Sequence, residues 1–316
     1  MERRKIQLIA NSTYTLSLPK YWIKENNLKE KDEIMIYEQN NKSLVLSPDN
    51  IKEKDINEIS LKVDEYPENI DRILFSIYYL GIENITLYSD KKMTKEMKAE
   101  IRKALSNMSG TEINYEDEKK IIIKGLLDKS RIDIHQIIYR ITMIIDLSIQ
   151  NIFEGPELKE IRLNEDEIDR LYHLATKVIS MSLINSETLN SSKIKNTSFV
   201  PSYFLICKKL ESLADNINHF AQHIKKNKQK TGKTKEILEF IRNETDRTTK
   251  HILKEFPEIF KKLSEKERKS KKNEIFEIKD KILSDYLRDM LKYLIDIEDE
   301  LITCSFYNKM IKQGKL

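Results

Sequence analysis

The chain has 316 residues, of which 34% are charged, and it contains only six glycines and six prolines. This composition is typical of a helix-rich soluble protein, and the length allows two or three domains. The formal net charge of +4 is too small to indicate a polyanionic partner by itself, so its distribution matters more than its total. No apolar run approaches the roughly 18 residues that cross a bilayer, and the opening MERRKIQLIA turns polar too soon for a secretory signal.

The two cysteines, Cys207 and Cys304, lie inside amphipathic helical patterns. Their separation matches no metal-ligand spacing. We therefore expect two reduced thiols in or near a hydrophobic core, as in a cytoplasmic protein.

Residues 1–50 predict four short strands and one short helix. Strands are expected at 3–9, 14–18, 34–36 and 44–46, the helix at 20–26, and a turn at 39–41. So few short elements bury little apolar surface alone. A partner subunit is therefore expected, as an interleaved homodimer.

This stretch resembles the AbrB/SpoVT/MazE swapped-hairpin DNA-binding fold. The resemblance rests on Leu18-Pro19-Lys20, the turn at Leu28, Lys31-Asp32-Glu33 and the final strand. It implies that basic side chains of this region contact DNA, and clustered cations favour DNA by displacing its counterions. Up to residue 24 the single acid is Glu2, and the basic residues are Arg3, Arg4, Lys5, Lys20 and Lys24. Thr15 stands where some DNA binders of the family carry arginine, so a module that only dimerises is the alternative.

Residues 57–127, after a charged linker at 51–57, predict a small α/β domain. Strands are expected at 59–63 and 85–87, helices at 70–80 and 94–108, and a hairpin at 113–115 and 121–123. The sequence shows no phosphate-cradling glycine loop and no nucleophile–base pair, which favours a structural or sensory spacer. The segment resembles the middle part of archaeal PhoU-type regulators.

From residue 128 onward the apolar pattern has a helical period. Helices are expected at 132–153, 164–183, 201–226, 235–256 and about 274–310, with a polar loop at 185–198. Asn164 is a plausible N-cap, and the acids at 165–167 then suit the helix dipole. The basic runs at 225–235 and 261–272 are expected to be solubilising loops.

Rows of acids follow the apolar faces of these helices. On the helix at 201–226 the apolar seam is Ile206, Leu210, Leu213, Ile217, Phe220 and Ile224. Beside it, Glu211, Asp215 and His219 recur four apart, and the preceding helix repeats this spacing with Glu165, Asp169 and His173. The last helix carries Asp296 and Glu300 beside its own seam. Carboxylates four apart can bridge metals from adjacent turns, and histidine favours iron or zinc over magnesium. The alternative is a solvated shoulder of a bundle helix.

These rows carry a second resemblance, to the PhoU family. The matching segments are NEDEIDRLYHLATKVISMSL, KKLESLADNINHFAQHI and MLKYLIDIEDELI. The resemblance implies two three-helix bundles side by side, with acidic motifs that bind multinuclear iron or zinc clusters. In the second repeat Lys292 replaces the first acid of the motif, and the middle helix is shortened.

The expected fold is α+β and mostly α. It consists of a swapped β-hairpin (AbrB-like) module at 1–50, a small α/β domain at 57–127 and PhoU-like three-helix-bundle repeats at 128–313, divided into 128–228 and 232–313. Together the two resemblances imply an archaeal-type regulator of phosphate uptake in which a metal-binding helical domain is coupled to a DNA-binding homodimer.

Two other functions are alternatives to this regulator. One is an adaptor that docks on a phosphate-transporter ATPase and uses the N-terminal module only to dimerise. The other is a carboxylate-bridged di-iron enzyme. Such enzymes need Glu-x-x-His pairs on two helices, a spacing that no helix here places beside an acidic row, so catalysis is not expected.

Overall fold

The computed structural model describes residues 3–9, 13–38, 44–47, 57–127, 132–227 and 232–315. These residues form two compact units, 1–56 and 57–316, and each is described by itself. The predicted turn at 39–41, most of the predicted linker, and residues 228–231 of the first basic run lie outside the described residues.

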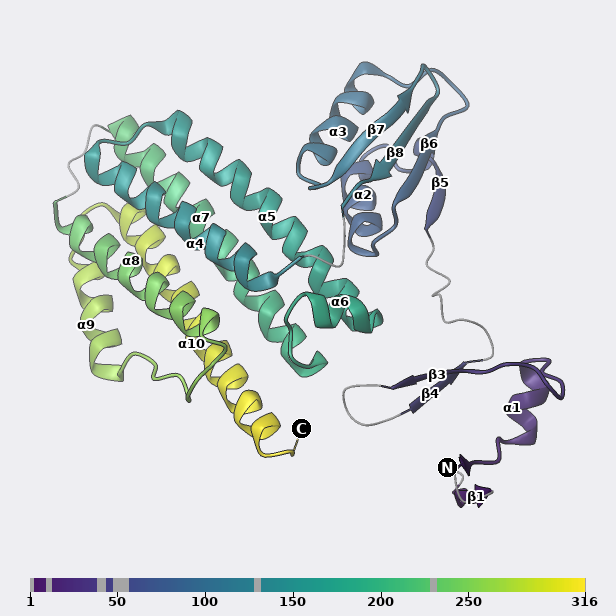
Figure 1. Ribbon diagram of the computed structural model, residues 1–316. Helices are drawn as coiled ribbons and strands as arrows, with labels where there is room; N and C mark the ends of the chain where they lie inside the picture. The colour runs from purple at the N-terminus through teal and green to yellow at the C-terminus, as the bar shows by residue number, and fades with distance from the viewer. Residues whose placement is uncertain are drawn as a thin grey trace. The chain divides into compact units, whose positions relative to one another are not determined.

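The N-terminal unit contains two antiparallel hairpins and one helix (Figure 1). Strand β1 (Gln7–Ile9) pairs with β2 (Thr13–Thr15), and β3 (Met35–Glu38) pairs with β4 (Leu44–Ser47). Helix α1 (Lys20–Glu25) lies between the hairpins in the sequence and follows Pro19. This confirms the four predicted strands and the predicted short helix.

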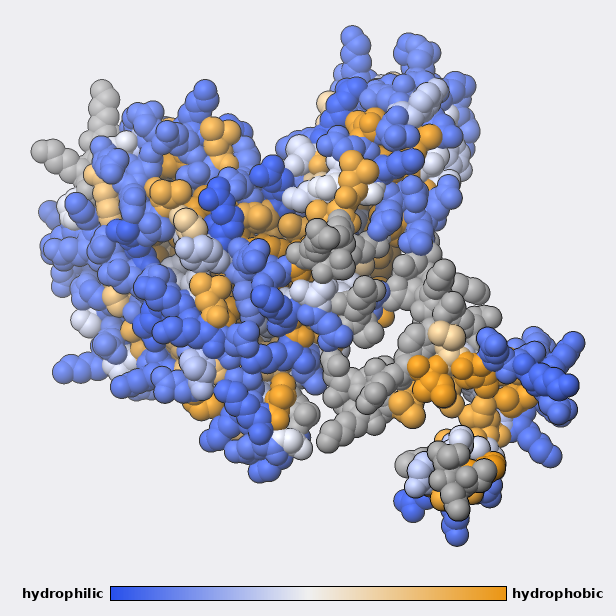
Figure 2. Space-filling view, in the orientation of Figure 1, coloured by the Kyte–Doolittle hydropathy of each residue, from blue (hydrophilic) through white to orange (hydrophobic). Residues whose placement is uncertain are grey.

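The apolar side chains of this unit are largely open to solvent. Helix α1 contributes no buried residue. Large apolar side chains from the described part of the unit are between 41% and 69% exposed, namely Ile6, Leu8, Ile9, Tyr14, Leu16, Tyr21, Met35, Ile36 and Leu44. Figure 2 shows apolar residues gathered on the visible face of this unit. A single copy therefore does not provide the core that these residues need.

Residues 57–127 form a four-stranded sheet with the order β5-β6-β8-β7. The sheet is mixed, because β5 and β6 are parallel and the other neighbours are antiparallel. Its elements are β5 (Glu58–Lys62), the 3₁₀ turn η1 (Val63–Glu65), α2 (Ile70–Tyr79), β6 (Asn84–Tyr88), α3 (Lys95–Ser106), β7 (Thr111–Glu116) and β8 (Lys120–Gly125). This confirms the small α/β segment.

One face of this sheet provides the local core. Ile85 pairs with Ile123, and Leu87 pairs with Ile121, and all four side chains are at most 2% exposed. They belong to the same hydrophobic core as the buried residues of α2 and α3. The alternation of buried and less buried residues along β6 and β8 is the period-two pattern of a sheet with one packed face.

The remaining residues form a helical bundle built around α7. Helix α7 packs against α4, α5 and α10, and α8 packs against α4 and α10 (Figure 1). The helices are α4 (Ile134–Glu154), α5 (Leu158–Ile184), α6 (Ser186–Ser191), α7 (Val200–Asn227), α8 (Gly232–Leu253), α9 (Glu265–Phe276) and α10 (Lys281–Lys312), with a 3₁₀ turn, η3 (Thr197–Phe199), before α7. The predicted seam of α7 is 0–3% exposed along its length, so the helical period located the core correctly.

Three details of this region differ from the sequence-based expectation. Helix α5 begins at Leu158, so Asn164 lies inside the helix, where its Nδ2 donates to Ser148 Oγ at 3.0 Å. The acids at 165–167 are therefore not in a first turn, and the helix dipole does not explain them. The expected loop at 185–198 contains α6.

The third difference is α9, which forms within the run expected to be a loop. Ser264 and Glu267 make a reciprocal capping box at its start, which satisfies backbone donors that a free helix end would leave unpaired. The helix has 12 residues, against 27 in α5, in agreement with the expected shortening.

Both cysteines are buried and free. Burial raises the pKa of each thiol to about 12, so both are neutral core side chains at ordinary pH. Within the described residues, no helix is both long enough and apolar enough to cross a membrane.

Candidate metal centre

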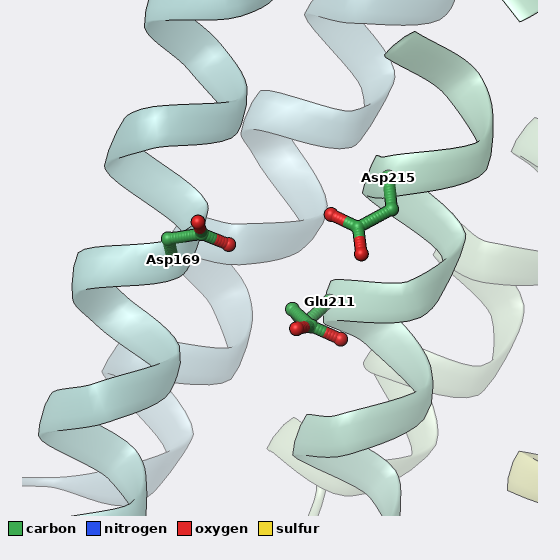
Figure 3. Close-up of side chains that lie close together, drawn as sticks. All are labelled: Asp169, Glu211 and Asp215. Atoms are coloured by element: carbon green, nitrogen blue, oxygen red, sulfur yellow. The ribbon is translucent and has the colours of Figure 1, made fainter. Parts of the chain in front are cut away.

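Three carboxylates from two neighbouring helices converge in the bundle. Asp169 comes from α5, and Glu211 and Asp215 come from successive turns of α7. One oxygen of each lies within 4.8 Å of the others, and Figure 3 shows the three side chains in the space between the two helices. Residues four apart lie on the same face of a helix, so the pair on α7 and the single acid on α5 meet at one point.

The carboxylates oppose one another's ionisation. Burial and the neighbouring charge of Asp215 raise the pKa of Asp169 to about 7. Burial and Glu211 raise the pKa of Asp215 to about 6. Glu165, one turn before Asp169, also has a raised pKa, through burial and then the charge of Asp166. A cation placed among these groups would remove the repulsion that raises these pKa values.

A lysine already supplies one positive charge here. Lys208 Nζ is 2.7 Å from both carboxylate oxygens of Glu211. The Glu211 side chain is only 12% exposed, whereas that of Lys208 is 44% exposed. Lys208 therefore balances the charge of Glu211, and among the ion pairs of the described residues none places a cation equally close to Asp169 or Asp215.

The donor set fits a divalent metal. All three donors are carboxylates, which suit hard cations such as magnesium and manganese and also bind iron. They come from two rigid helices, and the site is partly buried. Asp169 and Asp215 would have to be deprotonated to act as ligands, so proton release would accompany metal binding.

Comparison with known families identified two segments of the chain. Residues 134–224 match the PhoU domain, and residues 7–54 match the family described as antidote-toxin recognition MazE, bacterial antitoxin. The two matches confirm the expected pair of domains. Both families are regulatory and not enzymatic. No curated protein and no solved structure matches the chain.

The three converging acids all lie in the segment that matches the PhoU domain, but the predicted histidines are not among them. His219 is exposed, and its ring stacks on Tyr286 of α10 at 5.9 Å. Glu165 accepts a hydrogen bond from Asn218 Nδ2. Its charge contributes to the raised pKa values of Asp169 and Asp215, which makes it an electrostatic neighbour of the three ligand candidates.

His173 lies at a contact between α5 and α2. Its Nδ1 is 2.6 Å from Tyr79 Oη, and its ring stacks on Phe75 with centroids 3.9 Å apart. Burial, and then the positive charges of Arg72 and Lys208, lower the pKa of His173 to about 4. The structure therefore places this imidazole in the packing between the sheet segment and the bundle.

The acids of the second repeat do not join the cluster. Asp296 forms an ion pair with Lys209 of α7 at 2.7 Å. Glu300 lies one turn further along α10 and is half-buried. Lys292 is exposed on the same helix. Among the described residues, Asp169, Glu211 and Asp215 form the single group of three or more candidate ligands.

The predicted DNA-contacting residues are all solvent-exposed. Arg3, Arg4 and Lys5 precede β1, and Lys20 and Lys24 lie in α1. Contact between these five side chains and DNA remains a prediction.

Sequence reasoning missed Lys208. The spacing could have predicted the ion pair, because Lys208 lies three residues before Glu211 and therefore on the same helical face. It also missed the contribution of α2, since residues about 94 positions apart in the sequence, such as Tyr79 and His173, give no local pattern.

Proposed function

We propose that this protein regulates phosphate homeostasis as a DNA-binding transcriptional regulator, with a metal-binding PhoU domain coupled to a MazE/AbrB-like dimer. The observation that carries the proposal is the convergence of Asp169, Glu211 and Asp215 inside the segment that matches the PhoU domain, on a chain that begins with a MazE-like segment. Its site of action is the cytoplasm, where promoter DNA is found.

The N-terminal unit supports a dimer. Its exposed apolar residues, among them Ile36 at 63% and Tyr14 at 69%, would be covered by the same residues of a second copy. An interface in which both copies present the same patch is the usual arrangement of a two-fold homodimer. Dimerisation would also bring two sets of the five exposed cations together, which raises the number of phosphates that one particle can contact.

The metal would be held by the carboxylates of Asp169, Glu211 and Asp215. Bound there, a divalent ion supplies positive charge that offsets the repulsion among these groups. Because the ligands lie on both α5 and α7, the metal-bound state links the two helices. The all-carboxylate donor set suits iron(II) or manganese better than zinc, and the nearby charge of Glu165, which contributes to the raised pKa values of Asp169 and Asp215, would also be offset by the metal.

DNA binding by the full chain tests the regulator. We expect genomic fragments selected by the purified protein to bind with an affinity that falls steeply as salt rises. Arg4→Ala with Lys5→Ala should weaken this binding at least tenfold. The matched control is Lys95→Ala with Lys159→Ala, two exposed lysines of α3 and α5, and it should leave the affinity unchanged.

Absence of DNA binding at low salt, in a protein that is still dimeric, would overturn the regulator proposal. That result would instead support the adaptor, which uses the N-terminal module to dimerise and docks on a phosphate-transporter ATPase. Thr15, at a position where some DNA-binding relatives of the fold carry arginine, is the observation that keeps this second function under test.

A further inference from the structure

A cleft of about 890 Å³ lies beside the three carboxylates. One wall is formed by α2 and α3, and the other by α5 and α7. Asp169 and Glu211 line it, whereas Asp215 does not, so a metal held by the three groups would be reached from this side. The volume lies within the range of small-molecule sites, which are roughly 300–1,000 Å³.

The cleft walls combine aromatic rings with charged groups. Phe75, Tyr79, Tyr172 and Phe204 line it, and rings of this kind bind flat organic groups. A cleft this large, with a hydrophobic portion next to a charged one, suits a small organic molecule with an ionic group better than a bare ion.

A divalent metal would neutralise the excess negative charge of the cleft lining. Its lining includes five acids, Glu68, Asp71, Glu100, Asp169 and Glu211, and three bases, Arg72, Lys103 and Lys208. The difference is two negative charges with all groups ionised. A divalent ion cancels this excess, so that the bases are no longer outnumbered and an anion can be accommodated.

Lys208 responds most directly to the metal. Both oxygens of Glu211 accept hydrogen bonds from its ammonium group at 2.7 Å. A metal that takes the Glu211 carboxylate competes with this ammonium group and repels it. Lys208 lines the cleft, and its Nζ is 5.0 Å from the centre of the Tyr172 ring, so the released group remains at the cleft wall.

A second cation is directed at the same region. The Arg72 side chain is 80% exposed, and it lines the cleft from α2. Arg72 and Lys208 act electrostatically on the same side chain, His173, although they come from opposite walls. Two cations on opposite walls, next to a metal site, match the oxygens of a phosphate group, which bind cations and metal together.

We propose that this cleft binds the phosphate group of a small molecule, and that it does so when a divalent metal at Asp169, Glu211 and Asp215 has displaced Lys208 from Glu211. The inference rests on the proposed function for its metal site, and it adds the ligand class and the order of binding. The binding of metal and the binding of phosphate are then coupled, because each ligand raises the affinity of the protein for the other by the same factor.

The test measures two affinities on the full chain. Protein stripped of metal and protein loaded with Mn²⁺ are each titrated calorimetrically with inorganic phosphate and with AMP. We expect the better of the two probes to bind at least tenfold more tightly to the Mn²⁺-loaded protein. A preference for AMP identifies phosphate carried on an organic group, and equal binding identifies free phosphate.

Variants separate the proposal from a purely structural role. Lys208→Gln should bind Mn²⁺ at least twofold more tightly, because a competing charge is gone, and should bind phosphate at least fivefold more weakly. Arg72→Gln should weaken the binding of phosphate and leave the binding of Mn²⁺ unchanged. Lys95→Gln, an exposed lysine of α3 outside the cleft lining, should change neither affinity.

Equal phosphate affinity with and without Mn²⁺ would overturn the inference, and so would unchanged phosphate binding in Lys208→Gln. Binding of spermidine in place of phosphate would also overturn it, and would assign the cleft to cationic ligands. DNA binding measured on the same preparations keeps the two proposals apart. If it is intact while phosphate fails to bind, the regulator stands and the cleft assignment does not.

Discussion

The hydroxyl of Tyr79 and Nδ1 of His173 are 2.6 Å apart, and this contact joins α2 of the sheet segment to α5 of the bundle. The contact continues along α5 at four-residue intervals. Lys177 Nζ lies 4.3 Å from the centre of the Tyr78 ring. Residues four apart share one helical face, so the face of α5 that carries Asp169 at the candidate metal site continues as the face that contacts α2.

Gly81 shows how closely the two segments approach. It ends α2 with a φ of +77°, and a Cβ built there would lie 2.6 Å from Met181 Sδ. Glycine adopts this conformation without a steric cost, and other residues do not. The sheet segment thereby contacts α5 three turns from the candidate ligand Asp169, so α5 physically links the sheet segment to the candidate metal site.

Removing the Tyr79 hydroxyl tests this link. Tyr79→Phe keeps the ring but deletes the partner of His173, and we expect it to lower the free energy of unfolding by about 1 kcal/mol. Tyr88→Phe, on an exposed tyrosine of β6, is the matched control and should stay within about 0.5 kcal/mol of the original protein. Chemical denaturation monitored by circular dichroism gives both values, and equal stabilities of the two variants would show that the contact contributes nothing.

The helical core and the acidic rows were predictable because they are local patterns. The seam of α7 from Ile206 to Ile224 follows from helical periodicity alone, and so does the four-residue spacing of Glu211 and Asp215. The start of α5 was not predictable in the same way, because Asn164 before three acids imitates an N-cap. Pro156, eight residues earlier, was the better signal, since proline is disfavoured inside a helix and α5 begins two residues after it, at Leu158.

The assignment of His173 shows where sequence reasoning ends. Its spacing from Asp169 places it correctly on the same face of α5. That face, however, contacts α7 at Asp169 and α2 at His173. Only the long-range packing of α2, which has no counterpart in the local sequence, decides which partner each residue meets.

A charge placed in the exposed apolar surface of the N-terminal unit should prevent dimerisation. Ile36 is 63% exposed, and Ile36→Asp would put a carboxylate into the interface that we propose, where burial without a partner is costly. We expect the dimer to dissociate at least a hundredfold more readily, as measured by analytical ultracentrifugation across a concentration series. Leu163→Asp, on an equally solvent-accessible leucine of α5 that is 59% exposed, should leave the association unchanged. A dimer that resists Ile36→Asp but dissociates with Leu163→Asp would place the interface on the bundle.

The raised pKa of Asp169 predicts how the metal-free protein responds to pH. Its pKa is about 7 in the folded chain, mainly because of burial and Asp215, against 3.8 for the ordinary group. A carboxyl group whose folded pKa is raised stabilises the fold fully below its unfolded pKa, and that contribution is lost as pH rises through the folded value. The metal-free protein should therefore lose stability at this site between about pH 4 and pH 7.

Asp169→Asn should remove this pH dependence. After allowance for solvent screening, we expect it to stabilise the metal-free protein by about 1 kcal/mol at pH 8 and to have little effect at pH 4. Thermal unfolding in the presence of a chelator measures both. His173 acts in the opposite direction, because its pKa is lowered to about 4 and its contribution is lost as pH falls below about 6.5. The comparison is therefore made between Asp169→Asn and the original protein at each pH.

The proposed metal binding would distinguish the first repeat from the second. Asp215→Asn keeps the size of the side chain but removes one of three converging carboxylate charges, and we expect it to weaken Mn²⁺ binding at least tenfold. Asp296→Asn alters an acid of the second repeat that is paired with Lys209, and it should leave Mn²⁺ binding unchanged. Equilibrium dialysis followed by elemental analysis measures both variants.

The affinity of the original protein should also rise between pH 6 and pH 8. Asp169 and Asp215, with pKa values of about 7 and about 6, must lose their protons before they bind a metal, so protons compete with Mn²⁺ in this range. A pH-independent affinity, or equal losses in Asp215→Asn and Asp296→Asn, would remove the metal from this site. The carboxylates of the acidic cluster would then repel one another within the bundle, with Lys208 partly offsetting the repulsion. A phosphate in the adjoining cleft would have no metal to contact.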